Sequence, residues 1–314
     1  MEFCVHLIPR ALLAAIALAV LSACSDSGRG GKEASADAGS GVADGKPMVV
    51  TTFSIVADLA RNVGGEKAEV VSIVPIGADV HTYQPTPPAI AAIQSADLLL
   101  WNGLNLEIWF ERFLEGIDAP YILVSEGVEP ISIGVDGADV PNPHAWMSLS
   151  NARLYVENIR DALIGIDPDS EEAYRANAES YLAKIDALDG TLRERLAAVP
   201  EERRVLATSE GAFSYLARDL GLRELYIWPM NADAQGTPDQ MRAMITDVRQ
   251  SGAPAVFSES TVSDKPARQV AREAGVAYGG VLYVDSLSQP GGPVPSYLDL
   301  MTVTTDAIAK ALER

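Results

Sequence analysis

Cysteine and histidine are scarce in this sequence. Its 314 residues include two cysteines and three histidines. Cys4, His6 and Cys24 all lie near the N-terminus, so the rest of the chain has no thiol that an extracytoplasmic compartment would oxidise. That part of the chain keeps two imidazoles, those of His81 and His144.

Basic residues are also few. Lys and Arg number 24 against 43 Asp and Glu, which gives a formal net charge of −19. An acidic surface argues against nucleic acid and against an anionic bilayer face as direct partners. It mildly favours cations near the surface, but it also keeps many secreted proteins soluble, and solubility alone explains the bulk charge.

The N-terminal apolar run, residues 11–20, is too short to span a bilayer. It follows Arg10 and ends in Leu-Ser-Ala-Cys, which resembles the bacterial lipoprotein signal with its lipid on the cysteine sulfur. We therefore predict a signal peptide at residues 1–23 and a lipid anchor at Cys24. The anchor would hold the protein outside the cytoplasm, in the periplasm or on the outer face of the cytoplasmic membrane. An ordinary secretory signal with a chance cysteine, or a short anchor, is the alternative.

Residues 24–46 are predicted to form a flexible tether. They consist mainly of Gly, Ser, Ala and Asp, with almost no large apolar residue, and cannot bury a core. The chain that follows is long enough for one large domain or two of typical size.

After the tether, strand-like and helix-like segments alternate. The strands are apolar along their whole length, which is typical of parallel sheets covered by helices on both faces. One long amphipathic helix, residues 168–199, separates two runs of four strands. The predicted fold class is α/β with two four-stranded, mainly parallel sheets. We expect strands at 48–53, 68–74, 98–101, 121–124, 205–208, 225–228, 255–257 and 281–284, and N-terminal helix caps at Ser54, Thr86 and Ser296.

Four polar side chains follow predicted strands at the point where each strand ends. His81 comes after the second strand and His144 after the fourth. Glu210 and Asp285 come after the first and last strands of the second run. Ligands of open parallel sheets bind outside the carboxyl ends of the strands, so these side chains meet if the two edges face each other. Two imidazoles and two carboxylates form a ligand set whose charge balances a divalent metal ion.

Each of these residues also has an ordinary structural explanation. A loop histidine is more often a polar surface residue than a ligand. Glu210 could cap the helix that follows it, and Asp285 could serve a turn. Glu259 also follows a predicted strand and is an equally well placed carboxylate. Position alone therefore does not select the four residues.

Five spaced segments carry a family resemblance: GADVHTYQPTP (77–87), WNGLNLE (101–107), NPHAWMS (142–148), TSEGAFSYL (208–216) and YVDSLS (283–288). With them, the chain resembles the metal-binding receptor lipoproteins of bacterial ABC transporters for manganese, zinc and iron, the cluster A-I (cluster 9) substrate-binding proteins. The resemblance covers nearly all of the chain beyond the tether. It implies that His81, His144, Glu210 and Asp285 are the metal ligands.

The resemblance also implies a fold. Two α/β lobes, residues 47–166 and 200–314, would be joined by a rigid backbone helix over residues 167–199, with the metal in the cleft between the lobes. Such receptors move less than hinge-bending ones because a stiff helix replaces flexible crossover strands.

The chain departs from the family pattern beside both histidines. The usual Asp-Pro-His has Val80 in place of proline before His81, and Asn142 in place of aspartate two residues before His144. Neither change touches a ligand. The second replaces a supporting carboxylate, so we expect it to affect the orientation of the His144 imidazole.

A receptor of this family would capture a divalent metal outside the inner membrane and deliver it to a membrane permease powered by a cytoplasmic ATPase. It would be a monomer, not an enzyme, and would not bind nucleic acid. Glu210 as third ligand and the lack of a His-rich loop favour Mn²⁺, with Fe²⁺ next and Zn²⁺ third. Up to six nitrogen and oxygen donors suit Mn²⁺ better than tetrahedral Zn²⁺, although Zn²⁺ should bind at least as tightly by the Irving–Williams trend. Binding should weaken as the pH falls toward the histidine pKa.

Two other functions fit a site of this composition. A metalloenzyme needs an open coordination position, which four protein ligands hardly leave, and the sequence contains no HExxH or GxSxG motif. A surface adhesin with a structural metal is the other alternative. An adhesin folded by its metal should unfold without it, whereas a transport receptor should stay folded.

Overall fold

Two parallel four-stranded sheets carry the fold, as the apolar strand pattern predicts. The computed structural model describes residues 45–313 except 115, 136 and 232–235. The predicted signal peptide, Cys24 and the tether up to residue 44 lie outside the described residues. None of the helices described is both long enough and apolar enough to cross a membrane.

The first sheet has the strand order β2-β1-β3-β4, and all its pairs are parallel. Val49 in the middle of the sheet is paired with Val70 on one side and Leu98 on the other. The two central strands are the most deeply buried, which explains their lack of alternation. The strands are β1 (Met48–Thr51), β2 (Glu69–Ser72), β3 (Leu98–Trp101) and β4 (Tyr121–Leu123).

The second sheet has the strand order β10-β9-β7-β8 and is also parallel throughout. Its central strands β7 and β9 are buried along their whole length. The strands are β7 (Val205–Glu210), β8 (Arg223–Trp228), β9 (Ala255–Glu259) and β10 (Ala277–Leu282).

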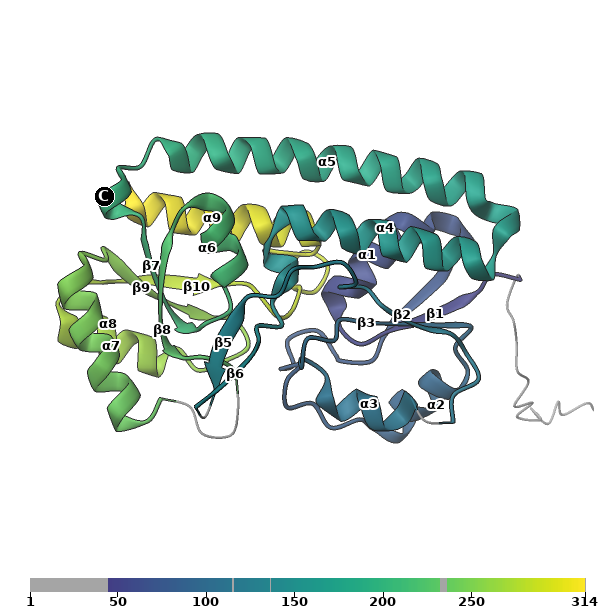
Figure 1. Cartoon of the computed structure of the whole chain (residues 1–314), viewed down its shortest axis with the longest axis horizontal. Helices are drawn as coiled ribbons and strands as arrows, with labels where there is room; N and C mark the ends of the chain where they lie inside the picture. Colours follow the sequence, from purple (N-terminus) through teal and green to yellow (C-terminus); the bar gives the residue numbers. More distant parts are fainter. Residues whose placement is uncertain (1–44, 115, 136, 232–235, 314) are drawn as a thin grey trace, which may run out of the picture. The chain divides into compact units, whose positions relative to one another are not determined.

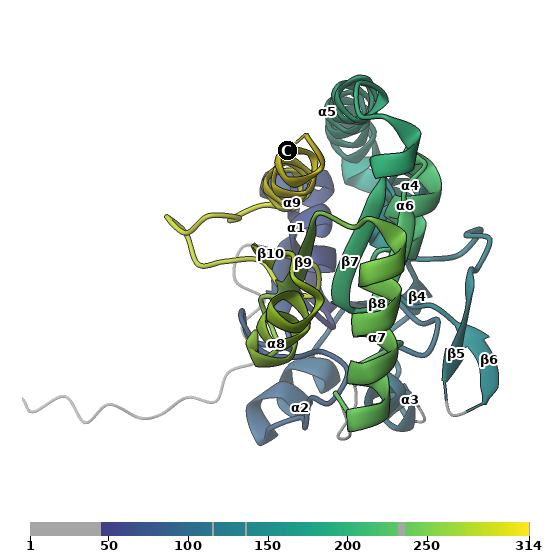
Figure 2. The same cartoon turned by 90° about the vertical axis from the view of Figure 1, so that its left-hand side faces the viewer.

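Helices flank both sheets, and one antiparallel hairpin lies beside β8 (Figures 1 and 2). The hairpin consists of β5 (Ser132–Val135) and β6 (Ala138–Pro141), a segment that reads as a loop in sequence because it is rich in Gly, Pro and Asp. The helices are α1 (Ser54–Gly64), α2 (Pro87–Gln94), α3 (Ile108–Leu114), α4 (Leu149–Ile166), α5 (Glu171–Ala197), α6 (Ser214–Leu220), α7 (Pro238–Ser251), α8 (Lys265–Ala274) and α9 (Tyr297–Leu312).

The long helix predicted at residues 168–199 is α5, which runs for 27 residues behind a short 3₁₀ turn at Pro168–Ser170. At 1.5 Å per residue it spans about 40 Å. It contacts α1, α4 and α9, and in Figure 1 it runs along the top of the view above α4 and α9. Its apolar face contains Tyr174, Tyr181 and Ile185, all buried.

The hydrophobic core is continuous between the two sheets. One cluster of buried side chains includes Val49 of β1, Leu206 of β7 and Tyr297 of α9. Contacts group the described residues into one compact unit, and the C-terminal helix α9 packs against α1. The division into lobes at residues 47–166 and 200–314, with a linking helix at 167–199, therefore stays a prediction.

Of the three predicted N-terminal helix caps, one forms a side-chain cap hydrogen bond in the structure. Ser296 caps α9 by accepting a hydrogen bond from the Asp299 amide. Thr86 occupies the cap position of α2 but makes no side-chain cap hydrogen bond. Ser54 is the first residue of α1, not its cap, because its hydroxyl instead accepts a hydrogen bond from the distant Leu287 amide at 3.0 Å.

The last strand lies earlier than its predicted range of residues 281–284. β10 starts at Ala277, and its Gly279 and Gly280 read as a turn in sequence. A Cβ atom at Gly279 would collide with the ring of Phe257 on the neighbouring strand. The glycine therefore allows close approach of two strands, which apolar patterning does not reveal.

Candidate metal centre

The structure brings His81, His144, Glu210 and Asp285 together. Each offers one ligand atom, and these atoms all lie within 4.8 Å of one another. The two imidazole Nε2 atoms are 3.3 Å apart. Oε1 of Glu210 lies 3.6 Å from Nε2 of His81 and 3.5 Å from Nε2 of His144. Oδ1 of Asp285 also lies 3.5 Å from Nε2 of His144.

Glu210 and Asp285 lie at or shortly after the carboxyl ends of parallel strands, whereas His144 follows the hairpin β5–β6 and not β4 directly. His81 lies in the loop beyond β2, and Glu210 is the last residue of β7 instead of following it. His144 directly precedes a 3₁₀ turn at Ala145–Met147. Asp285 comes three residues after β10. Segments far apart in sequence therefore converge on one point.

The site is closed to solvent. The side chains of His144 and Glu210 are 0% exposed, and that of His81 is 5% exposed. Asp285 is buried as well. Ionised groups at this depth are costly unless paired or bound to a metal. The two histidines are therefore not polar surface residues.

Asn142 fixes the imidazole of His144. Its Oδ1 accepts hydrogen bonds from the His144 amide at 3.1 Å and from Nδ1 at 2.8 Å. Its Nδ2 donates to the carbonyl oxygen of Gly211 at 2.7 Å. A backbone donor on one side and a backbone acceptor on the other orient the amide, so Nδ1 of His144 carries the proton. Nε2 faces the carboxylates and offers a lone pair to a metal when it carries no proton.

The WNGLNLE segment supports the same loop from behind. The Asn102 side chain donates a hydrogen bond to the carbonyl oxygen of Pro143 at 3.0 Å, next to His144. Glu107 in turn accepts hydrogen bonds from the amides of Asn102 and Gly103, both at 2.9 Å. The segment therefore fixes the position of the backbone next to His144.

The backbone around His81 is also held. Oδ1 of Asp79 accepts a hydrogen bond from the His81 amide at 2.9 Å. The indole of Trp109 donates to the carbonyl oxygen of Val80 at 2.8 Å. Val80, which replaces the usual proline, is fully buried, so its side chain contributes to the core.

Two carboxylate oxygens of the cluster have no hydrogen-bond partner within the described residues. They are Oε2 of Glu210 and Oδ1 of Asp285, and both are buried. The other oxygen of each carboxylate accepts a hydrogen bond, from the Asn231 amide to Glu210 at 2.7 Å and from the Thr261 hydroxyl to Asp285 at 3.1 Å. Unpaired buried acceptors are rare, and a bound cation would satisfy both.

Glu259, the equally placed carboxylate, has a different role. Its Oε1 accepts hydrogen bonds from the amides of Ser209 at 3.0 Å and Glu210 at 3.3 Å. It is not among the residues whose ligand atoms converge. Glu259 thus holds the end of β7, and Glu210 projects from that end.

Burial sets the protonation states. Burial raises the pKa of Glu210 well above its usual range, and the Asp285 and Glu259 carboxyls add to the rise. Burial would also raise the pKa of Asp285, but the nearby imidazole of His144 outweighs it and leaves that pKa below its usual value. Burial lowers the pKa of His81 to about 4. Without metal, the site therefore favours a neutral His81 and a protonated Glu210.

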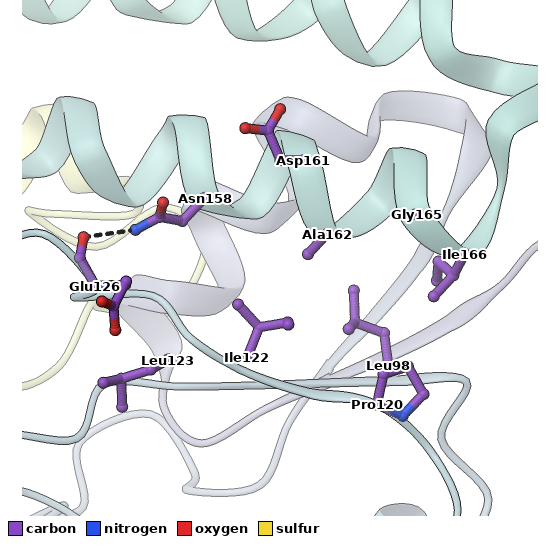
Figure 3. A pocket seen from close by; sticks show the side chains of 10 residues that line it. All are labelled: Leu98, Pro120, Ile122, Leu123, Glu126, Asn158, Asp161, Ala162, Gly165 and Ile166. Carbon is purple, nitrogen blue, oxygen red and sulfur yellow. Dashed lines mark hydrogen bonds between the residues drawn. The ribbon is translucent and has the colours of Figure 1, made fainter.

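Apart from the metal cluster, a hollow of about 480 Å³ lies between α4 and strands β3 and β4 (Figure 3). Its lining is mainly apolar, with Leu98, Ile122 and Ile166 facing it. None of the four converging residues lines it.

Two residues that support the metal cluster, Asn231 and Thr261, were not predicted from sequence. Thr261 follows the end of β9, so the rule that selected the other four applies to it too.

The sequence and fold match known proteins over most of the chain. The family model of the periplasmic zinc-uptake complex component A, ZnuA, matches residues 49–311. The iron-binding protein YfeA of Yersinia pestis is 56% identical over 267 residues, 84% of this chain and 86% of that protein. The manganese ABC transporter substrate-binding lipoprotein PsaA of Streptococcus anginosus is 36% identical over 278 residues, 86% of this chain and 90% of that protein.

A solved structure has the same fold. The Mn-bound periplasmic metal binding protein from Candidatus Liberibacter asiaticus matches with a TM-score of 0.80 at 43% identity, covering 85% of this chain and 100% of that chain.

Proposed function

Because this chain belongs to the family of the periplasmic zinc-uptake complex component A, we propose that it captures one divalent transition-metal ion and delivers it to an ABC permease. The family consists of substrate-binding transport proteins, so the metal is cargo and not a catalyst. The metalloenzyme alternative is therefore set aside.

One observation carries the proposal. Two imidazole Nε2 atoms and one carboxylate oxygen each from Glu210 and Asp285 converge in a buried place. Each of these carboxylates also has one buried oxygen without a hydrogen bond from the described residues. All four converging atoms offer a lone pair when they carry no proton, so a cation stabilises the set. Two carboxylates neutralise a 2+ charge, so the loaded site contains no uncompensated charge.

We propose Mn²⁺ as the cargo, with Fe²⁺ as the next candidate and Zn²⁺ third. Nitrogen and oxygen donors without thiolate suit Mn²⁺ and Fe²⁺, and carboxylates in particular suit Mn²⁺. The names of the relatives include manganese and iron, and the family model is named for zinc, so these names fit all three ions without ranking them.

The loaded protein would dock on a membrane permease powered by a cytoplasmic ATPase. It would do so as a monomer held to the membrane by a lipid on Cys24, with residues 24–46 as the tether. Two lobes, residues 47–166 and 200–314, would enclose the ion. The continuous core and the long helix α5 support only small movement of the lobes.

The test is calorimetric titration of the chelator-stripped soluble domain with Mn²⁺ and, separately, Zn²⁺. We expect one saturable Mn²⁺ site per chain that is lost or severely weakened in His144→Ala and Glu210→Ala. Glu66→Ala, at an exposed position, is the matched control and should bind like the unmodified protein. A site that survives both substitutions, or tight Zn²⁺ binding without any Mn²⁺ binding, would overturn the ligand set or the choice of metal.

A further inference from the structure

The two carboxylates of the metal centre are held differently. Oδ2 of Asp285 accepts a hydrogen bond from the Thr261 hydroxyl at 3.1 Å, and the Asn231 side-chain amide lies 3.5 Å from the same oxygen. Oδ1 of Asp285 faces His144 and has no hydrogen-bond partner in the described part of the chain. One oxygen of Asp285 is thus directed at the histidines while the other is bound to the protein.

Glu210 leaves more of its carboxylate available. Its Oε1 accepts the Asn231 amide but also faces both histidines, at 3.5 and 3.6 Å. Its Oε2 is buried without a hydrogen bond from the described residues. A carboxylate oxygen has two lone pairs, so Oε1 can keep its hydrogen bond and still bind a cation. Glu210 is therefore arranged to bind through both oxygens.

This difference sets the number of protein donors. Two imidazole nitrogens, two oxygens of Glu210 and one oxygen of Asp285 make five donors. Oδ2 of Asp285 faces two donors, the Thr261 hydroxyl and the Asn231 side-chain amide, so both of its lone pairs are engaged, unlike those of Oε1 of Glu210. A sixth donor would require this oxygen to turn toward the metal, which would break or stretch its bond to Thr261. Zn²⁺ prefers four ligands and tolerates five, whereas Mn²⁺ takes six oxygen-rich donors readily. The donor number therefore bears on the choice between these metals.

We propose that Thr261 is a specificity-determining residue of the metal centre. Its hydroxyl restricts Asp285 to one oxygen, and this restriction lowers the preference of the site for Mn²⁺ over Zn²⁺. Thr261 does not contact the metal itself and acts by positioning Asp285. The inference rests on the proposed metal-binding function.

The test compares Thr261→Val, which has the same shape without the hydroxyl, with Thr261→Ser, which keeps the hydroxyl. Competition titrations with Mn²⁺ and Zn²⁺ give the ratio of the two affinities for each protein. We expect the ratio to move about tenfold toward Mn²⁺ in Thr261→Val, a change equivalent to about 1.4 kcal/mol. Thr261→Ser should keep the ratio of the unmodified protein. An unchanged ratio in Thr261→Val, or an equal change in Thr261→Ser, overturns the inference.

Co²⁺ provides a readout that a purely structural role would not move. Its visible absorption weakens as the coordination number rises, because the site geometry determines the spectrum. We expect weaker absorption per bound Co²⁺ in Thr261→Val than in the unmodified protein and Thr261→Ser. Identical spectra in all three contradict the inference.

The outcomes separate this inference from the proposed function. If the unmodified protein binds neither Mn²⁺ nor Zn²⁺, the metal-binding function fails. If it binds them and Thr261→Val leaves both ratio and spectrum unchanged, only the role of Thr261 fails. Should Thr261→Val not fold, Thr261→Ala lacks the same hydroxyl and carries the same prediction.

Discussion

Replacing Asn142 by aspartate would restore the Asp-Pro-His pattern usual in the family, yet we expect it to destabilise this protein. The Asn142 amide donates to the Gly211 carbonyl at 2.7 Å and to the Ser214 hydroxyl at 3.1 Å. A carboxylate cannot donate, and it would place an oxygen against the buried carbonyl oxygen of Gly211. The bonds to His144 would persist because they use Oδ1 as acceptor.

The magnitude follows from these contacts. Each lost hydrogen bond costs about 1 kcal/mol, and a buried carbonyl left without its donor costs about 1–3 kcal/mol. A charged acceptor strengthens the bond from Nδ1 of His144 and offsets about 1 kcal/mol of the loss. We expect Asn142→Asp to lower the free energy of unfolding by about 2 kcal/mol at pH 7, a fall of about 5 °C in Tm.

The loss of unfolding free energy in Asn142→Asp should depend on pH. The new carboxyl, buried against a carbonyl oxygen, has a folded-state pKa above its unfolded value of about 3.9. Below that unfolded value the group is protonated in both states and can donate to Gly211, so the deficit is small. The deficit grows as the pH rises through the unfolded value toward the folded one.

The assay is thermal unfolding of metal-free protein at pH 7.5 and pH 5, followed by calorimetry. Asn105→Asp is the control because it adds the same charge at an exposed position. A Tm for Asn142→Asp within 1 °C of that control at pH 7.5 would refute this reasoning about the amide.

Three other outcomes are expected. Mn²⁺ binding at pH 7 should release protons, because burial raises the pKa of Glu210 well above its usual range and a ligand must be deprotonated. A binding enthalpy that is the same in buffers of different ionisation enthalpy, measured by calorimetry, would contradict this. Burial lowers the pKa of His81 to about 4, so this group stays neutral between pH 7 and pH 5. Protonation of Glu210 should therefore contribute to the loss of affinity over that window, and protonation of His81 should not. An NMR titration of the metal-free protein that shows the His81 ring gaining a proton between pH 7 and pH 5 would contradict this. The Ser148 hydroxyl caps α4 by accepting a hydrogen bond from the Asn151 amide. Ser148→Ala should therefore lower the free energy of unfolding by about 1–2 kcal/mol, measured by urea denaturation. An unchanged denaturation midpoint would show that the cap does not stabilise the protein.

Much of the fold is predictable because apolar patterning reports burial. The strand at Leu98–Trp101 occurs where the sequence places it, and α9 begins directly after its predicted cap, Ser296. The hairpin β5–β6 and the early start of β10 were missed. Both involve glycine, which signals turns but here permits extended strands in close contact, as at Gly279 against Phe257.

The candidate site was predictable in its position but not in its support. Strand ends locate Glu210 and Glu259 equally well, and the direction of each side chain decides between them. Backbone amides bind the Glu259 carboxylate, whereas Glu210 is left to face the histidines. Sequence also does not reveal that burial lowers the pKa of His81 to about 4, so the pH at which this imidazole gains a proton does not follow from its ordinary value.

Crystallographic location of the metal tests the central claim most directly. Diffraction data from Mn²⁺-loaded crystals, collected on both sides of the manganese absorption edge, would show where the ion binds. We predict one anomalous peak about 2.0–2.6 Å from ligand atoms of His81, His144, Glu210 and Asp285. A manganese peak elsewhere, with these four side chains remote from it, would contradict the account.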